Sequence, residues 1–167
     1  MKKQTIELLA PAGSWEALEA AVNAGADAVY MGGKAFGARQ YASNFDREEM
    51  QKAVYFAHMH RVRLYITVNT LVADYLLFLS NVGIDGIIVQ DLGVIRLARQ
   101  IVPDLPLHAS TQMTVTNSEG VKLAAEAGME RVVLARELSL EEINTICHGT
   151  DTEIEVFIHG ALCVCYL

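Results

Sequence analysis

Short apolar runs recur along the chain, and segments with helical spacing separate them. The stretches "AVNAGADAVYMGG", "LSNVGIDGIIVQD" and "AAEAGMERVVLAR" share one arrangement: a helix end, a glycine, one or two linking residues and an apolar strand. Glycine ends a helix at low cost because it adopts the left-handed C′ conformation easily. Gly25, Gly83 and Gly128 therefore predict the same helix-to-strand joint three times.

Extended along the whole chain, this pattern predicts seven strands that alternate with six helices. The expected strands are continuous apolar runs, as in a sheet that is covered on both faces: Ile6–Ala10, Ala28–Met31, Arg63–Asn69, Gly86–Gln90, Leu107–Met113, Arg131–Ala135 and Glu153–Ile158. The expected helices are Trp15–Ala24, Asp46 to about His60, Tyr75–Val82, Gly93–Ile101, Asn117 or Ser118 to Ala127, and Ser139 to about Cys147. The starts of three of these helices carry capping residues, namely Ser14, Asp46, and a capping box of Ser139 with Glu142.

Such alternation indicates a parallel sheet with right-handed crossovers, which a doubly wound sheet and a (β/α) barrel both provide. A barrel is favoured because polar residues follow nearly every strand instead of gathering at one switch point: Tyr30, Asn69, Gln90, Asp91, Gln112, Arg136, Glu137 and His159. The predicted fold is α/β, a TIM-like (β/α) barrel that is incomplete, because the eighth unit is missing. Residues 1–167 are thus expected to be the truncated N-terminal barrel domain of a longer protein.

One connection departs from the regular pattern. The helix expected between the third and fourth strands is short for a parallel crossover, which suggests that chain is missing near Asp74–Tyr75.

Composition narrows the class of protein. Apolar residues make up 52% of the chain and the net charge is −7, which argues against wide, non-specific binding of nucleic-acid phosphates but leaves room for a local basic patch. Three cysteines fit no disulfide framework and predict a reducing, cytoplasmic compartment. No run of about 18 apolar residues occurs, so no membrane span is expected.

Polar residues inside two expected strands are the first candidates for chemistry. In 107–113, side-chain alternation places His108, Ser110 and Gln112 on one face of the strand. Such residues either fill a barrel layer by bonding to one another or bind a ligand.

The last expected strand raises a similar question. Alternation places Glu155, Phe157 and His159 on one face. A buried Glu is costly unless it is paired, and Arg136 at the end of the neighbouring strand is the expected partner, with Glu137 and Asp91 as alternative contacts. A structural ion pair and a functional one are both compatible with this pattern.

A glycine-rich loop and two cysteines complete the candidates. The loop "GGKAFGARQYASNF" carries Lys34 and Arg39, so its amides and cations could hold an anion, although a flexible barrel loop would look the same. Cys163 and Cys165 could be metal or cluster ligands, or a chance pair, and Cys163 with His159 could form a nucleophile and base.

Several long stretches resemble the collagenase-like peptidase family U-32: "ELLAPAGSWEALEAAVNAGADAVYMGG", "QDLGVIRLARQIVPDLPLHASTQMTVTN" and "RVVLARELSLEEI". The ending resembles the family signature E-x-F-x-x-G-[SA]-[LIVM]-C at Glu155, Phe157, Gly160 and Cys163. This resemblance implies a barrel that acts as a peptidase, or in oxygen-independent hydroxylation of RNA bases or of the ubiquinone ring. Hydroxylating relatives are expected to use an iron–sulfur cluster bound by four cysteines, with prephenate as oxygen source.

The resemblance maps Cys163 onto the first cluster cysteine and leaves Cys165 without a place in the signature. The family pattern is not followed after Tyr166, so no intact metal site is expected within these 167 residues.

Three functions follow. The first is hydroxylation of RNA, most plausibly of a tRNA wobble uridine, in which Arg136 or Arg39 could hold a carboxylate of prephenate. The second is peptide hydrolysis, for which the sequence shows no diagnostic nucleophile or metal motif. The third is a non-catalytic scaffold whose open sheet edges pair with a second copy. The residues expected to act in catalysis are His108, Gln112, Arg136, Glu155 and His159, those expected to bind substrate are Lys34, Arg39, Asn69 and Gln90, and the metal ligand is Cys163.

Overall fold

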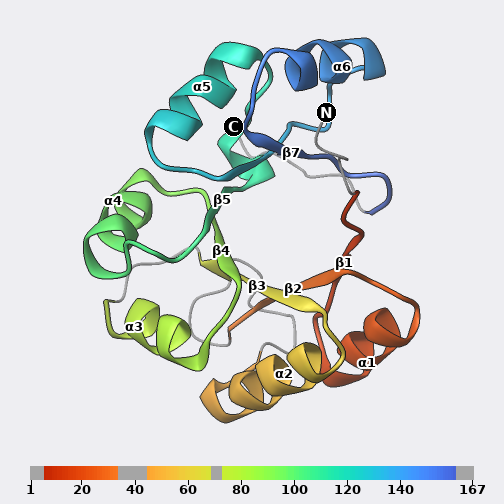
Figure 1. Ribbon diagram of the computed structural model, residues 1–167, viewed down its shortest axis with the longest axis vertical. Coiled ribbons are helices and arrows are strands. Elements are labelled where there is room, and N and C mark those ends of the chain that lie inside the picture. The colour runs from red at the N-terminus through yellow and green to blue at the C-terminus, as the bar shows by residue number, and fades with distance from the viewer. Residues whose placement is uncertain (1–5, 34–44, 69–72, 161–167) are drawn as a thin grey trace.

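The computed structural model describes residues 6–33, 45–68 and 73–160. Within these ranges seven strands form one parallel sheet in chain order: β1 (Leu9–Pro11), β2 (Ala28–Gly32), β3 (Arg63–Val68), β4 (Gly86–Val89), β5 (Leu107–Ala109), β6 (Arg131–Val133) and β7 (Glu153–Glu155). Figure 1 shows the sheet curling around a central axis, with β1 and β7 as its two edges. This order confirms the predicted incomplete TIM-like barrel, because a doubly wound sheet would reverse direction at a switch point.

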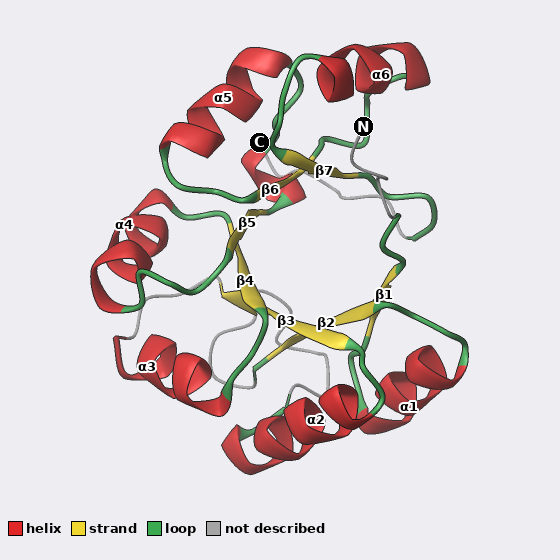
Figure 2. Ribbon diagram, viewed as in Figure 1, coloured by secondary structure: helices red, strands yellow, loops and turns green. Residues whose placement is uncertain are grey.

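The helices form a ring around the outside of the curled sheet (Figure 2). They are α1 (Trp15–Asn23), α2 (Arg47–Met59), α3 (Ala73–Val82), α4 (Leu92–Ile101), α5 (Ser118–Glu126) and α6 (Leu140–His148), with one short 3₁₀ helix, η1 (Thr111–Met113). No helix in the described ranges has the length and apolar character needed to cross a membrane.

The local signals read from the sequence are present at the helix ends. The Ser14 side chain accepts a hydrogen bond from the Ala17 amide, and both Asp46 and Ser139 form complete capping boxes. The three predicted joint glycines all have positive φ, between 83° and 89°. Each repeated joint is therefore built as its sequence indicates.

The β3-to-β4 crossover contains the ten-residue helix α3. β3 and β4 pair in parallel, with Tyr65 opposite Gly86. A Cβ atom at Gly86 would lie 3.1 Å from the Pro106 carbonyl oxygen and 3.4 Å from the Tyr65 ring, so glycine permits this close pairing. Formation of this crossover does not need additional chain at Asp74–Tyr75.

The core has two parts because side chains alternate across each strand. Outward-facing side chains such as Leu64, Ile66 and Ile87 are fully buried against the helices. Inside the curl, a smaller apolar cluster consists of Ala28, Tyr65 and Ile88, with Leu9 and Tyr30 packed against it. Polar residues fill much of the remaining interior, as described below.

Four strands end earlier than predicted: β4 and β6 by one or two residues, at Val89 and Val133, and β5 and β7 by more. For β5 the reason is local. β5 ends at Ala109 because the Ser110 hydroxyl accepts a hydrogen bond from the Gln112 amide and caps η1, which Thr114 then ends at φ 54°. This side-chain bond competes with the sheet ladder. β7 ends at Glu155. The predicted strands through Met113 and Ile158 were therefore wrong at their carboxyl ends, and so were the faces deduced from them.

Candidate site at the carboxyl ends of the strands

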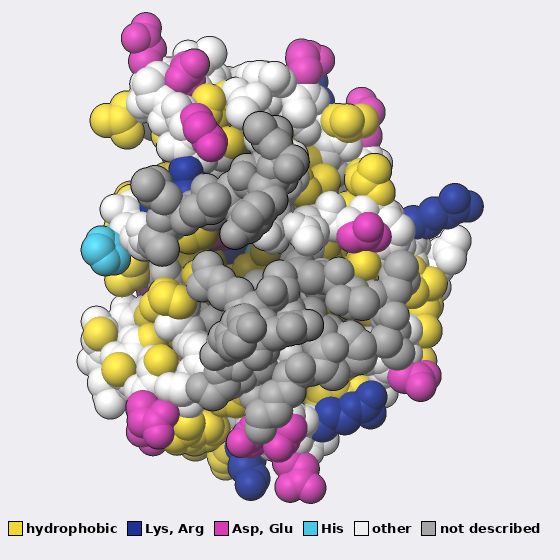
Figure 3. Space-filling model, turned by 180° about the vertical axis from the view of Figure 1, so that it is seen from behind, with side chains coloured by type: hydrophobic (Ala, Val, Ile, Leu, Met, Phe, Trp, Pro, Cys, Tyr) yellow, Lys and Arg dark blue, Asp and Glu magenta, His cyan; other side chains and the backbone are white. Residues whose placement is uncertain are grey.

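Four of the predicted site residues lie after the carboxyl ends of strands, which is the active-site face of a barrel. Gln90 follows β4 and Arg136 follows β6, and both are half-buried; Gln112 in η1 and His159 after β7 are exposed. Figure 3 shows this face, where the coloured acidic and basic side chains are scattered around the rim. The described part of this face therefore carries scattered charged side chains, without a continuous basic surface.

Arg136 links the ends of two neighbouring strands. Its guanidinium carbon lies 5.1 Å from the centre of the Phe157 ring, and its Nη2 atom donates a hydrogen bond to the Gly160 carbonyl oxygen at 3.1 Å. Both contacts fit a planar guanidinium, which stacks on aromatic faces and donates in fixed directions. Arg136 therefore positions the 157–160 segment, and its predicted pairing with Glu155 was wrong.

His108 lies inside the barrel and not on the rim. Its side chain is 4% exposed and packs edge-on against Tyr65, with ring centres 4.6 Å apart. Burial, reinforced by the positive charges of Arg131 and Arg63, lowers the pKa of His108 to about 3. The imidazole is therefore neutral at physiological pH. Because β5 ends at Ala109, His108 does not share a strand face with Gln112 as predicted.

Arg131 is the buried centre of an ion-pair network that was not predicted from the sequence. It donates to Glu7 through Nη1 at 2.6 Å, and to the Oε2 atom of Glu153 through Nε and Nη2 at 2.9 and 2.7 Å. Glu7 also pairs with Arg63 and accepts from the Tyr65 hydroxyl at 3.3 Å. Burial disfavours the charged guanidinium, but the hydrogen bonds to Glu153 and Glu7 outweigh it and raise the pKa of Arg131.

The position of this network indicates a structural role. Arg63, Arg131 and Glu153 are the first residues of β3, β6 and β7, and Glu7 precedes β1. They lie at the amino ends of the strands, opposite the active-site face, where barrel residues serve stability. The sequence feature that could have indicated this network is an arginine at the start of a buried apolar strand, because a buried arginine needs a carboxylate partner inside the fold.

Glu155 also faces the interior. The cation that it faces is Arg131, whose Nη1 atom lies 3.6 Å from Glu155 Oε2, beyond hydrogen-bond distance. Burial raises the pKa of Glu155, and the attraction of Arg131 only partly offsets this effect. Arg131, not Arg136, is thus the arginine that Glu155 faces.

The remaining predicted residues cannot be placed. Lys34, Arg39, Asn69 and Cys163 lie outside the described residues, as does Cys165. Within the described ranges, no group of three His, Cys, Asp or Glu side chains could hold a metal ion, and Cys147 is an exposed thiol on α6. The described residues therefore do not provide a site for an iron–sulfur cluster.

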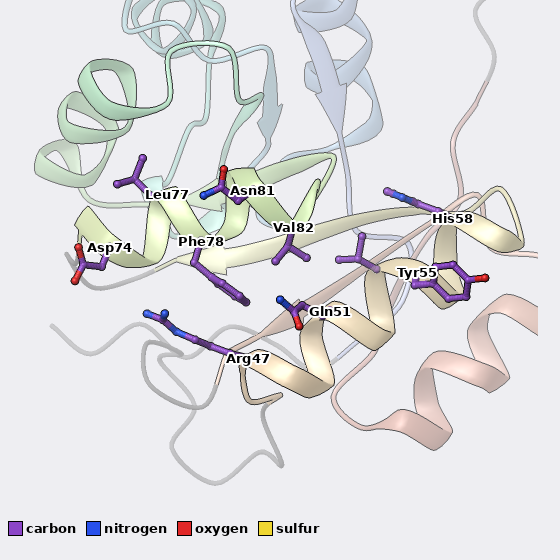
Figure 4. A pocket seen from close by; sticks show the side chains of 10 residues that line it. Arg47, Gln51, Tyr55, His58, Asp74, Leu77, Phe78, Asn81 and Val82 are labelled. Atoms are coloured by element: carbon purple, nitrogen blue, oxygen red, sulfur yellow. The ribbon is translucent and has the colours of Figure 1, made fainter.

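A groove of about 740 Å³ lies on the outside of the barrel, between α2 and α3. Arg47 reaches across it, with its guanidinium carbon 4.9 Å from the centre of the Phe78 ring (Figure 4). His58, at the other end, is hydrogen-bonded to Asp85 at 2.9 Å. The groove contains none of the predicted site residues, so the strand ends remain the candidate site.

Comparison with known proteins places the chain in a family. Its sequence matches peptidase family U32 over residues 13–167. The chain belongs to peptidase family U32. Among its U32 relatives are tRNA hydroxylation protein P1 of Bacillus subtilis, 43% identical over 96% of this chain, and the 23S rRNA 5-hydroxycytidine C2501 synthase of Escherichia coli, 41% identical over 96%. The chain spans 40% and 25% of the lengths of these two relatives.

Solved structures agree with the fold. The structure of the U32 peptidase Mk0906 superimposes with a TM-score of 0.71 over 93% of this chain and 70% of that chain, at 17% identity. A thiamine phosphate pyrophosphorylase from Pyrococcus furiosus follows at a TM-score of 0.62, over 89% of this chain and 72% of that chain, also at 17% identity. At such identities the likeness supports the barrel fold alone.

Proposed function

We propose that this chain is the barrel domain of a protein that hydroxylates RNA bases. The observation that carries the proposal is its 43% identity, over 96% of its length, to a protein named for tRNA hydroxylation. A 39% identical relative from Escherichia coli is also named a tRNA hydroxylation protein. A pyrimidine of tRNA, with the wobble uridine first, is the proposed substrate, and an rRNA cytidine is the alternative that the 41% identical synthase suggests.

In this proposal the rim residues bind and orient the reacting groups. Arg136 holds its guanidinium over the Phe157 ring, and a guanidinium fork suits a carboxylate, so the proposed oxygen-donating co-substrate is prephenate. Gln112 and His159 are exposed in the segments that follow β5 and β7, at the same end of the barrel, and in this proposal they contact a base edge. An iron–sulfur cluster bound through Cys163 remains a prediction from the family signature, and no step is assigned to it here.

Peptide hydrolysis is the second candidate, because the family bears that name. Acyl transfer by a side chain needs a nucleophile activated by a neighbouring base. In the described part of the chain, His58 and His60 bond to Asp85 and to a carbonyl, His148 bonds to a carbonyl, and the Nδ1 of His108 has no partner. None of these four histidines is paired with a hydroxyl or thiol side chain there. The fifth, His159, has Cys163 as its candidate nucleophile, and Cys163 lies outside the described residues. The preference for RNA hydroxylation therefore rests on the names of the similar relatives.

A genetic experiment distinguishes the two candidates. The gene for the full-length protein is deleted from its host, and nucleosides from purified tRNA and rRNA are measured by mass spectrometry. We expect one hydroxylated pyrimidine to disappear and to return on complementation. The RNA fraction in which it disappears identifies the substrate class. Unchanged nucleosides in both fractions would overturn the proposal.

A further inference from the structure

The sheet has two edge strands, β1 and β7, which are not paired with each other (Figure 1). On β7, the Glu153 amide donates to the Glu130 carbonyl oxygen, and the Glu155 carbonyl oxygen accepts from the Leu134 amide. The N–H and C=O groups of alternate residues in a parallel strand point to opposite sides. Those of Ile154 therefore point away from β6, toward the interval between β7 and β1. We call this interval the opening.

The other edge strand has the same arrangement. The Leu8 carbonyl oxygen accepts from the Ala28 amide, and the Ala12 amide donates to the Tyr30 carbonyl oxygen, so both residues bond to the β2 side. The backbone groups of Leu9 therefore point away from β2 and into the opening. In the described part of the chain, no strand lies on that side of β1. Two edges that border one opening are positions where another strand can add.

The outer face of the sheet is poorly covered at both edges. Leu9 packs into the interior cluster and Glu155 faces Arg131 inside, so their neighbours Leu8 and Val156 face outward. These two side chains are 47% and 39% exposed, whereas outward-facing side chains of the inner strands are fully buried. The described helices therefore cover the sheet less completely at its edges than at its centre.

The two helices that border the opening are also less buried than the others. α1 and α6 each bury a single residue, Leu18 and Ile146, whereas α2 buries four and α3 and α4 bury three each. α1 and α6 lie at the two ends of the ring of helices, so each has a described neighbour on one side only (Figure 2). A further helix between them would complete the ring.

The geometry fits one more strand. Arg131 on β6 reaches Glu7, which precedes β1, at 2.6 Å, and its guanidinium lies 5.4 Å from the centre of the Tyr65 ring on β3. With β7 and one more strand between them, β6 and β1 are three strand spacings apart, which is roughly 14 Å along the sheet and less across its curl. An arginine and a glutamate side chain can together span that distance. Eight strands also give the barrel size whose interior is just filled by side chains.

We propose that the polypeptide that follows residue 167 in the full-length protein closes the opening, with a helix that packs between α6 and α1 and a strand that pairs in parallel with both β7 and β1. Residues 1–167 are then the amino-terminal part of the protein, as the sequence predicts. The strands follow one another around the sheet in chain order, so the next unit belongs beside β7. The relatives are long enough to supply it, because this chain spans 40% and 25% of the lengths of two of them. Pairing with β1 ends at Pro11, which has no N–H.

A second copy of the chain is the alternative occupant, and it fits less well. Its own edge strands lie in a curled sheet with helices on the outer side, α1 next to β1 and α6 next to β7. An opening that accepts one strand leaves no room for a strand that brings such a sheet with it. The occupant is therefore part of the same polypeptide.

Hydrogen exchange of the full-length protein tests the strand. Exchange is measured residue by residue at a concentration where sedimentation shows a monomer, with the Glu153 amide as internal control because it bonds to the Glu130 carbonyl in any case. We expect the Leu9 and Ile154 amides to exchange within about tenfold of the Glu153 rate. Exchange at the rate of an unstructured peptide at either position, or protection only in a dimer, would overturn the proposal. RNA is absent from this experiment, so its failure would leave the proposed hydroxylation untouched.

Thiol labelling tests the covering of the outer face independently. Leu8→Cys and the control Leu123→Cys are compared in the full-length protein, because Leu123 is 68% exposed on α5, a helix that does not border the opening. We expect a thiol reagent to modify position 8 at least about tenfold more slowly than position 123, since the closing unit covers position 8. Equal rates at the two positions would overturn the proposal.

Discussion

Arg131 donates a hydrogen bond to Glu7 at 2.6 Å, although 124 residues separate them in the chain. Glu7 precedes the first strand, and Arg131 begins the sixth, so this bond crosses the open side of the barrel. It joins the segment before β1, one edge of the sheet, to β6, the neighbour of the other edge strand β7. The amino-terminal end of this incomplete barrel is therefore joined by side chains.

Replacing Arg131 should lower the free energy of unfolding more than removing an exposed ion pair does. In Arg131→Met, Glu7, whose side chain is 12% exposed, loses its buried partner, and breaking such a buried pair typically costs about 3–5 kcal/mol. Urea unfolding followed by circular dichroism measures the loss. The control Lys122→Met removes an exposed pair with Glu119 and should leave the unfolding midpoint unchanged. Equal midpoints for the two variants would contradict the structural role of Arg131.

Acid should destabilise the fold through His108. Folding lowers the pKa of His108 from 6.5 to about 3, so below pH 6.5 the unfolded chain binds a proton that the folded protein does not. The free energy of unfolding is therefore unaffected by this group above pH 6.5 and decreases as the pH falls toward 3. The contribution to the free energy of unfolding should decrease by about 1.4 kcal/mol per pH unit below 6.5. In His108→Phe the free energy of unfolding should change less between pH 7 and pH 5 than in the wild type. His148→Gln, which replaces an exposed ring, should keep the wild-type pH dependence. A steep slope that persists in His108→Phe would contradict this account.

Gly33 should not tolerate a side chain. A Cβ atom there would overlap the Tyr75 hydroxyl and lie 3.6 Å from the Met50 methyl group. Overpacking of this kind costs about 1–3 kcal/mol. In a double-mutant cycle, Gly33→Ala should be destabilising alone and largely rescued by Tyr75→Phe, with unfolding free energies as the readout. Strict additivity of the two substitutions would show that the overlap is relieved elsewhere.

Replacing Arg136 should reduce activity even when the positive charge is kept. Arg136→Lys keeps the cation but loses the planar stacking on Phe157 and the directed bond to Gly160. Hydrogen bonds to charged groups contribute about 1.5–3 kcal/mol, so we expect roughly tenfold or greater loss of RNA hydroxylation by the full-length protein. Phe157→Leu should cause a smaller loss of the same kind. Full activity in Arg136→Lys would remove Arg136 from the site.

The sequence predicted the helices, the strands and their order well, because the residues that specify them act locally. Helix caps such as Ser14 and Asp46 and the turn glycine Gly25 act within a few residues, and each is found as predicted. The site was predicted less well because its geometry depends on where strands stop. Ser110 turns the chain after Ala109, which moves Gln112 away from His108. The partnership of Glu7 with Arg131 crosses the whole barrel, and no local pattern indicates it.

The most direct test of RNA hydroxylation is a reaction with purified components. The full-length protein, purified without oxygen, is incubated with prephenate and with tRNA from a strain that lacks tRNA hydroxylation proteins, and the RNA is digested for mass spectrometry. The account predicts that one pyrimidine nucleoside gains the mass of one oxygen atom. RNA of unchanged mass, together with cleavage of added peptides by the same preparation, would contradict it.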